Sequence, residues 1–462
     1  MPGRPYYRDG AMFRVANVPS TTTAEIYGVA HRSFAASDVD CYQMAGGRII
    51  LRNLRIIPPP SGIPIWIDGH QGVVLEDISC EAGAADTCIE ILRCFDFSAT
   101  RVKSTALAGD AYPIGIVNSQ NGRISDCQLH SNRHCISMGG RDEVGSVPVR
   151  DILVSNCVFL NNPSLGFGAT DTHGNCEDIT FINCTINCVA NMGGRNIRYA
   201  NCTIFGRPPS ITPGDGGCVY GSETVGGTFE FSDCRFITYG NGLSFGTIYL
   251  GLENRKEDFT LLIKDCSIES LGSGASNVRM VMLGLGTSAG SHRVDTVIDG
   301  LVYIGSAAFA ALGLAGSADI SALSSHVIDR VRLPGGTLLL AASNAANYNA
   351  PLRLQELTGT VSMTATSGTS NTIASPITLR YAYPRVPQGD CSAVGGYNSN
   401  RMTYGTLHTL TPTQIRPMIE SGDATAWSAT ANNRPVNWRA SHDCGSAPVS
   451  LFRPFFPPNH SI

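Results

Sequence analysis

Charged residues are scarce in this sequence, and long apolar runs are missing from it. Asp, Glu, Lys and Arg make up 15% of the 462 residues, against about 25% in a typical soluble domain. This composition excludes a coiled coil, and a net charge of −4 gives no basic surface for nucleic acid. No segment has the about 20 apolar residues of a transmembrane helix, so we expect no membrane insertion. The first residues also lack the basic and apolar regions of a secretory signal peptide.

Metal-binding cysteine motifs are missing too, although the chain has 16 cysteines. Structural zinc sites use local C-x-x-C pairs, and the sequence contains none. It also contains no D-x-D-x-D-G loop and no nonapeptide repeat of the calcium-binding kind. We therefore expect no metal and no other cofactor. Without a signal peptide we expect free thiols, and whether Cys391 and Cys444 form a disulfide stays open.

What the sequence does contain is a short phrase that returns about every 27 residues. Examples are VVLEDISC (73–80), DILVSNCVF (151–159) and DITFINCTI (178–186). Each phrase alternates apolar and polar residues, as a β-strand does, and turn-forming residues cluster between phrases. We take one residue in the middle of each phrase as its anchor. The anchors are Asn53, Asp77, Ala99, Asp126, Asn156, Asn183, Asn201, Asp233, Asp265, Asp299, Asp329 and Glu356.

A repeat of this length cannot bury its apolar face alone, but stacked copies can. The sequence therefore predicts an all-β chain in which residues 46–365 form a parallel β-helix of about twelve coils. Residues 1–45 lack the phrase, which predicts a small N-terminal attachment or capping segment. Residues 366–462 are rich in aromatic residues and proline, which predicts a separate C-terminal β or irregular domain. Its aromatic residues could form a core, a subunit interface for trimerisation or a carbohydrate-binding surface.

Six cysteines directly follow their anchors, and stacking would place them in one column with a spacing of about 4.8 Å. A small apolar side chain suits such a crowded internal ladder. The alternative is a column of metal ligands, which we disfavour because zinc sites use local cysteine pairs. The six cysteines are Cys127, Cys157, Cys184, Cys202, Cys234 and Cys266.

Residues at equal distances from the column cysteines should lie next to one another on the outer surface. Asp171 and His173 follow Cys157 by 14 and 16 residues. Ionisable residues also stand at comparable distances from Cys127, Cys184 and Cys202. The predicted surface row is Arg141, Asp142, Glu143, Asp171, His173, Arg195 and Asp215. The alternative is that these residues only cap turns, as Asp often does.

Two reactions on a sugar chain fit this row. Two of its four carboxylates could hydrolyse a glycosidic bond, one as acid and one as base or nucleophile. Alternatively, Arg141 or Arg195 could bind a uronate carboxylate while His173 acts as the acid or base of a lyase. His173 fits that role because the ordinary pKa of histidine is close to neutral.

The repeated x-N-C-x-[IF] phrases and the long lateral turns resemble the pectate-lyase-like β-helix superfamily, and most of all bacteriophage tailspikes. The resemblance covers about residues 45–365. It implies a right-handed β-helix, a homotrimer, contacts with other virion proteins and a bacterial surface polysaccharide as partner. The D-x-H formed by Asp171 and His173 also resembles the catalytic pair of alginate epimerases and some β-helix lyases. Polygalacturonases carry an Asp-Asp pair that this chain lacks.

The sequence thus predicts a tailspike on the virion that binds and depolymerises a capsule, exopolysaccharide or O-antigen during host adsorption. The predicted catalytic residues are Asp171, His173, Asp142, Glu143 and Asp215, and the predicted substrate-binding residues are Arg141 and Arg195. One alternative is a spike of the same fold that binds the polymer without cutting it. Another is a bacterial polysaccharide lyase or epimerase, which would behave as a monomer in solution.

Overall fold

The computed structural model of this chain contains only β-strands as regular elements in the residues that it describes. It describes residues 11–27, 47–57, 59, 61–81, 87–105, 112–140, 147–162, 167–207, 217–239, 246–253, 255–271, 277–284, 292–305, 308–315, 326–343, 352–355, 358–366, 377–378, 390–393, 403–411, 414–420 and 434–438. None of these residues belongs to a helix that could cross a membrane. The chain divides into two compact units, Met1–Phe205 with Val219–Thr228 and Gly206–Cys218 with Phe229–Ile462.

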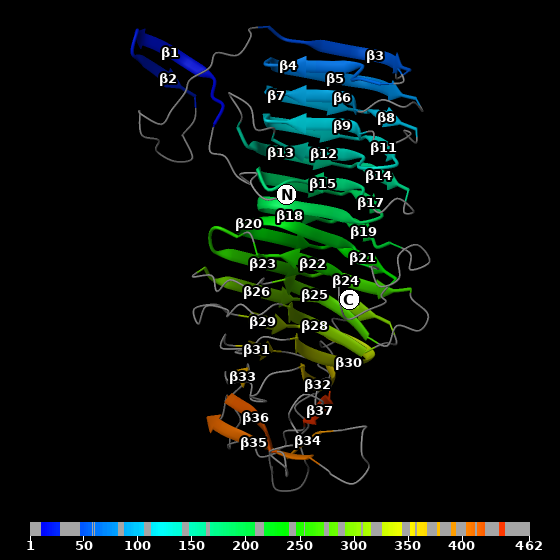
Figure 1. The fold of residues 1–462 in the computed structure, drawn as a ribbon, viewed down its shortest axis with the longest axis vertical. Coiled ribbons are helices and arrows are strands. Elements are labelled where there is room, and N and C mark those ends of the chain that lie inside the picture. The colour runs from blue at the N-terminus through cyan, green and yellow to red at the C-terminus, as the bar shows by residue number, and fades with distance from the viewer. Residues whose placement is uncertain are drawn as a thin grey trace, which may run out of the picture. The chain divides into compact units, whose positions relative to one another are not determined.

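Unit 1 is a stack of coils whose strands pair in parallel in three sheets (Figure 1). The first sheet contains β3 (Ile50–Ile56), β5 (Gln71–Cys80), β7 (Phe95–Thr100), β10 (Gln120–Ser125), β13 (Val149–Ser155), β16 (Cys176–Ile182) and β18 (Ala190–Ala200). The second contains β4 (Ile65–Asp68), β6 (Thr87–Leu92), β9 (Tyr112–Val117), β12 (Ile136–Gly139), β15 (Thr170–Thr172) and the start of β18. The third contains the end of β5, β8 (Lys103–Ser104), β11 (Gln128–Ser131), β14 (Val158–Asn161), β17 (Thr185–Asn187) and β19 (Thr203–Phe205). An antiparallel hairpin, β1 (Val15–Ser20) and β2 (Thr23–Ile26), precedes them.

Unit 2 continues the parallel pairing after β20 (Val219–Ser232), a strand that begins in unit 1. Its parallel strands are β21 (Arg235–Thr238), β22 (Ile248–Gly251), β23 (Phe259–Lys264), β24 (Ser267–Ser270), β25 (Asn277–Gly284), β26 (Val294–Asp299), β27 (Val302–Ile304), β28 (Ala308–Ala315), β29 (His326–Asp329), β30 (Arg332–Ser343), β31 (Leu352–Gln355), β32 (Thr358–Thr366) and β33 (Ile377–Thr378). The last strands pair antiparallel: β34 (Asp390–Ala393), β35 (Thr403–Thr411), β36 (Gln414–Glu420) and β37 (Arg434–Trp438). The predicted all-β chain with a parallel β-helix is confirmed.

The anchor residues turn the chain at the corner between the first and third sheets. In unit 1 the corner residues have φ angles of 50° to 56°, in the left-handed region that Asn and Asp tolerate better than most residues. They are Asn53, Asp77, Arg101, Asp126, Asn156, Asn183 and Asn201. The phrase is therefore repeated because each coil must make the same left-handed turn.

Three of the predicted anchors are wrong by one or two positions. Thr100 pairs with Ser125, so the corner residue in that coil is Arg101 and not Ala99. In unit 2, Asp299 pairs with Lys264, which leaves Gly300 at the corner. The next corner residue is Arg330, with φ 49°, and not Asp329. The anchors were chosen by residue type, and that choice failed in these coils because arginine or glycine occupies the corner.

The side chains of the corner residues form a hydrogen-bonded ladder along unit 1. The Asn183 amide donates to Asn156 Oδ1 at 3.2 Å, and the Asn201 amide donates to Asn183 Oδ1 at 2.7 Å. Asn156 donates in turn to Asp126 Oδ1 at 3.3 Å. These bonds tie successive coils together on the exposed side of the corner.

The cysteine column is confirmed on the buried side of the same corner. In unit 1, Cys127, Cys157, Cys184 and Cys202 are all buried and carry free thiols. The backbone register stacks them, because each of the first three accepts a 2.9 Å hydrogen bond from the next coil through its carbonyl oxygen. The neighbouring Cys157 and burial both raise the pKa of Cys127, so its thiol stays protonated. The column therefore packs the corner.

The unit 1 core is aliphatic, with one aromatic stack. The Phe181 and Tyr199 rings lie parallel with centroids 4.6 Å apart, and Phe159 meets Phe181 edge-on at 6.4 Å. All three side chains are fully buried. Burial of this apolar surface holds the coils together.

Asn183 tests the corner ladder, because it combines a left-handed backbone with two side-chain hydrogen bonds. We expect Asn183→Ala to lower the free energy of unfolding by about 1–3 kcal/mol, because it loses both bonds and places a Cβ-bearing residue in a strained conformation. Asn183→Gly loses the same bonds without that strain and should cost about 1 kcal/mol less. Urea unfolding of both variants measures the difference. An alanine variant as stable as the glycine variant would contradict the strained-corner interpretation.

Candidate active site

Asp171 is a carboxylate at an outward-facing position that is nevertheless buried. Its neighbours in β15 point inward, and Thr170 Oγ1 lies 3.5 Å from the hydroxyl of the buried Tyr199. The register places Asp171 opposite Ser137 of β12 and Asn191 of β18. Only 10% of its side chain is exposed. A buried carboxylate needs partners to stay ionised.

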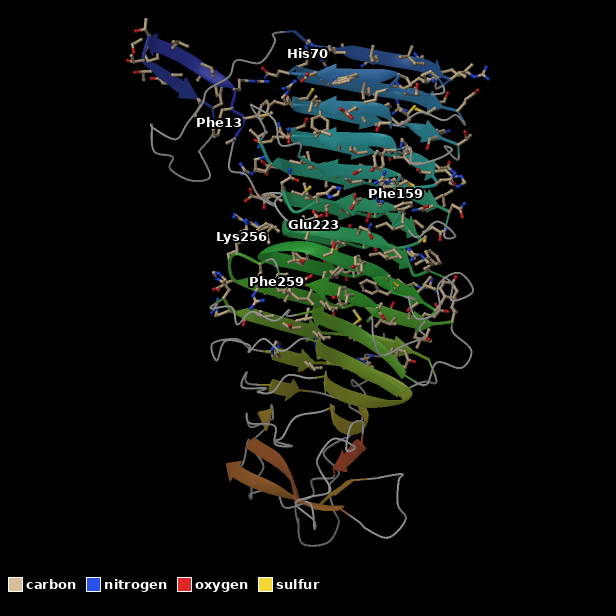
Figure 2. The ribbon with its side chains drawn as sticks, viewed as in Figure 1. Phe13, His70, Phe159, Glu223, Lys256 and Phe259 are labelled. Carbon is tan, nitrogen blue, oxygen red and sulfur yellow. The ribbon has the colours of Figure 1, made fainter. Side chains whose placement is uncertain are left out.

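His173 supplies the strongest partner of Asp171 and links it to a second carboxylate. Its Nε2 lies 2.9 Å from Asp171 Oδ2, and its Nδ1 lies 3.2 Å from Glu223 Oε2. Glu223 lies in β20 within unit 1 (Figure 2) and also accepts a 2.8 Å hydrogen bond from the backbone N–H of Gly174. The imidazole thus stands between two carboxylates, with 44% of its side chain exposed.

Two glycines make room for this arrangement. A Cβ at Gly139, in the preceding coil, would lie 2.9 Å from His173 Cδ2. A Cβ at Gly193 would lie 2.7 Å from the carbonyl oxygen of Thr172 and 3.0 Å from the Glu223 Cβ. Any larger residue at either position would push the imidazole or the Glu223 side chain away. The close approach of the three side chains therefore depends on glycine in both neighbouring coils.

The two carboxylates hold a proton on His173. Burial works to lower the pKa of His173, but hydrogen bonds to Asp171 and Glu223 outweigh it and raise the pKa to about 10. Burial likewise works to raise the pKa values of Asp171 and Glu223, and the hydrogen bonds from His173 overcome it and lower both. At neutral pH the group is therefore an imidazolium between two ionised carboxylates. The pKa of His173 therefore lies above the ordinary value of histidine.

A second histidine, His134, lies near Asp171 and is neutral, unlike His173. His134 Nδ1 lies 2.6 Å from the carbonyl oxygen of Gly168 and must donate to it, because a carbonyl only accepts. Its Nε2 is 3.6 Å from Asp171 Oδ2. Burial lowers the pKa of His134 despite the nearby carboxylate. The site therefore contains one charged and one neutral imidazole, and such a divergence of pKa values is typical of acid–base sites.

The structure brings together two residues of the predicted row, Asp171 and His173. Equal offsets predicted that Arg141 would lie opposite Asp171, but the register places Ser137 there, because the loop before β15 is longer than the loop before β12. Arg141, Asp142, Glu143 and Asp215 lie outside the described residues. Cys444, the possible partner of Cys391, does so as well.

Arg195 forms an ion pair in the first sheet of unit 1. Its Nη1 donates to Glu177 Oε1 at 3.0 Å, and the register pairs the two residues in the first sheet. Arg150 holds the other oxygen of Glu177 with two hydrogen bonds of 2.6 and 2.9 Å. Asp171 and His173 belong to the coil segment at the second sheet. Arg195 is therefore engaged by a buried carboxylate, and its predicted role in substrate binding stays a prediction.

Sequence reasoning missed Glu223 and gave His134 no role. Glu223 is 50 residues away from His173, and no repeated phrase marks it. The coil that carries it is longer than the coil before it, so an offset from a column cysteine could not find it. His134 has a usable signal, because it lies just before β12, separated from it by Cys135, and β12 is the strand opposite Asp171. Among the described residues, no group of three or more His, Cys, Asp or Glu side chains is arranged to hold a metal ion.

The raised pKa of His173 predicts a pH-dependent contribution to stability. The contribution is full below the ordinary value of 6.5 and is lost as the pH rises through about 10. It is also lost in acid, as the pH falls through the lowered pKa values of Asp171 and Glu223. We therefore expect His173→Gln to destabilise the protein most between about pH 5 and 6.5 and not at all above about pH 10.

Thermal unfolding of the parent and the variant from pH 4 to 10.5 measures this window. His292→Gln, at a partly exposed histidine of unit 2, is the control for the loss of a histidine outside this group. A constant difference between parent and His173→Gln across the whole range would contradict the imidazolium assignment.

Known proteins of the same fold carry the same strand arrangement. The tailspike protein gp49 from Pseudomonas phage LKA1 is 26% identical, with a TM-score of 0.67 over 95% of this chain and 74% of that chain. The tailspike gp61 of Pseudomonas phage phi297 is 27% identical, with the same TM-score and coverage. The Gp54 tailspike of Acinetobacter baumannii bacteriophage AP22, solved with a capsular saccharide, is 21% identical, with a TM-score of 0.55 over 95% of this chain and 76% of that chain. No curated protein sequence matches the chain.

A family model described as Gp49, pectin lyase-like, matches residues 82–337. That range includes the whole of the site around Asp171, His173 and Glu223. It also agrees with the parallel β-helix that the strands form. The chain therefore belongs to the Gp49 pectin lyase-like family.

Proposed function

We propose that this protein is a phage tailspike that binds a bacterial surface polysaccharide and cleaves it at the Asp171–His173–Glu223 group. The observation that carries the proposal is the His173 imidazole held between two carboxylates at a half-exposed position. Purely structural ion pairs also perturb pKa values, but this one combines a buried acid, a proton on an accessible ring and a neutral second histidine. The similarity to tailspikes, one of them solved with a capsular saccharide, supports the polymer as substrate.

The exposure and hydrogen bonds of the three residues support a separate role for each. His173 carries the proton that a departing sugar oxygen needs, so it acts as the acid. Glu223 has 31% of its side chain exposed and stays ionised, so it acts as the base towards water or a sugar C–H. Asp171, almost fully buried, keeps the imidazole charged and oriented. Because the ring separates the carboxylates, they do not form the pair about 5–5.5 Å apart that a retaining glycosidase uses.

Cleavage of a polysaccharide panel tests the proposal. Capsular polysaccharides, exopolysaccharides and O-antigens are incubated with the protein while new reducing ends and the ultraviolet absorbance of unsaturated uronates are followed together. Reducing ends alone mean hydrolysis, and both signals mean elimination. We expect Asp171→Asn, His173→Gln and Glu223→Gln each to reduce kcat by about 10²–10⁴-fold, the range for loss of acid–base catalysis.

Glu25→Gln is the matched control, because Glu25 is an exposed carboxylate of β2. It should retain the parent activity, and melting curves show whether the three site variants remain folded. Parent-like rates in all three site variants would overturn the site assignment. Binding without cleavage of any polymer would support instead the non-enzymatic spike. A homotrimer and attachment to other virion proteins are further parts of this proposal, and analytical ultracentrifugation checks the first.

A further inference from the structure

His134 is a buried histidine to which the proposed acid and base leave no role. Only 6% of its side chain is exposed. The carbonyl oxygen of Gly168, at 2.6 Å, fixes the proton of the neutral ring on Nδ1. The other ring nitrogen, Nε2, then carries a lone pair and lies 3.6 Å from Asp171 Oδ2. Two hydrogen-bond acceptors therefore face each other across this short gap.

Neighbouring coils hold the His134 ring in this orientation. Ile114 pairs with Ile136 in the second sheet. Tyr112 and His134 each precede that pair by two residues and so occupy equivalent positions. Their rings stack with centroids 5.7 Å apart and an interplanar angle of 10°, and Phe167 meets the imidazole edge-on at 5.6 Å. The ring is packed on two sides and bonded at Nδ1, so the position of Nε2 is fixed.

His134 and His173 approach the same oxygen atom. Asp171 Oδ2 accepts the 2.9 Å hydrogen bond from His173, and Ser137 Oγ donates to it at 3.4 Å. A proton on His134 Nε2 would turn this nitrogen into a charged donor to that oxygen. An oxygen shared between two imidazolium rings holds each of them less tightly than it holds one. Protonation of His134 therefore weakens the hold of Asp171 on the His173 proton.

The surroundings of His134 decide when it takes up that proton. Burial is the largest effect and brings the pKa of His134 below its ordinary value of 6.5. The charges of Arg133 and His173 act in the same direction, and the Asp171 carboxylate acts against them. Tyr112 stacks on the ring through a phenol, which carries no charge at neutral or acidic pH. His134 is therefore neutral at pH 7 and becomes charged as the pH falls below 6.5.

His173 holds its proton too tightly for an efficient acid at neutral pH. Burial works to lower its pKa, but the hydrogen bond to Asp171 is the largest effect that raises it, and the pKa reaches about 10. The most efficient catalytic acid has a pKa close to the working pH. A weaker bond to Asp171 and a positive charge on His134 both lower the pKa of His173. Its proton then passes more readily to a sugar oxygen.

We propose that His134 is a positioning residue that makes His173 a stronger acid when the surroundings become acidic. A proton on Nε2 draws Asp171 Oδ2 away from His173 and adds a second positive charge beside the proton that is transferred. This inference rests on the proposed function, because it concerns the regulation of the same site. It gives cleavage a maximum in mild acid, above the pH at which the base Glu223 is itself protonated.

The pH dependence of kcat tests the inference on a polymer that the parent cleaves. We expect kcat of the parent to rise roughly 3- to 30-fold from about pH 7.5 to about pH 5, a modest part of what acid–base catalysis contributes. It should fall again below about pH 4.5, where Glu223 takes up a proton. The His134→Asn variant keeps a donor for the Gly168 carbonyl in place of Nδ1 but cannot be protonated. Its kcat should lack the rise.

Two further variants separate titration from packing. His134→Phe keeps the ring contacts with Tyr112 and Phe167 but also lacks the proton, so it should lose the rise as well. His130→Asn, at a histidine of β11 in the third sheet, is the matched control and should keep the pH profile of the parent. Melting curves show whether each variant remains folded.

The NMR signals of the histidine rings give the same comparison without any polymer. In protein labelled with ¹³C-histidine, the His173 ring signals are assigned by their loss in His173→Gln. They should shift as the pH falls below 6.5 in the parent, because His134 titrates beside them. In His134→Asn they should stay unchanged down to about pH 4.5, where Glu223 begins to titrate.

The outcomes distinguish the inference from the proposed function. A rise in acid that persists in both His134 variants would overturn the inference, and so would a parent profile without a rise. A loss of kcat by the same factor at every pH in His134→Asn would show that His134 only supports its loop. In these cases the depolymerase proposal stands. If no polymer is cleaved, the proposed function fails and the ring signals decide: a His173 shift that depends on His134 supports the coupling, and its absence overturns it.

Discussion

The parallel hydrogen bonding between successive coils is the constraint on which the rest of this structure depends. It keeps equivalent residues of neighbouring coils in register, so any residue type that recurs at one position becomes a column. The corner asparagines bond to one another for this reason, and the thiols of Cys127, Cys157 and Cys184 stack beneath them. The stacked rings of Tyr112 and His134 arise in the same way.

The candidate site lies where neighbouring coils place ionisable side chains at outward-facing positions that are shielded from solvent. Asp171 is buried there at a cost that only charged partners can offset. His173 offsets this cost by carrying a proton, and Glu223 accepts a hydrogen bond from the other ring nitrogen of His173. The raised pKa of His173 therefore follows from its hydrogen bonds to two carboxylates, which outweigh the effect of burial.

Much of this could be predicted from the sequence, because strands and corners repeat locally. The alternation of apolar and polar residues predicted the strands, and the cysteines after the anchors predicted the column. Asp171 and His173 were found together because only one residue separates them. Glu223 could not be found, since its approach depends on the length of intervening turns and on glycines at 139 and 193. The pKa of His173 could not be predicted either, because it depends on that missing partner.

The central claim is that a polysaccharide binds at the Asp171–His173–Glu223 group and is cut there. A crystal structure of Glu223→Gln soaked with an oligosaccharide of a polymer that the parent cleaves tests it most directly. The account predicts a glycosidic oxygen within hydrogen-bond distance of His173. An oligosaccharide bound elsewhere on the protein, with this site empty, would contradict the account.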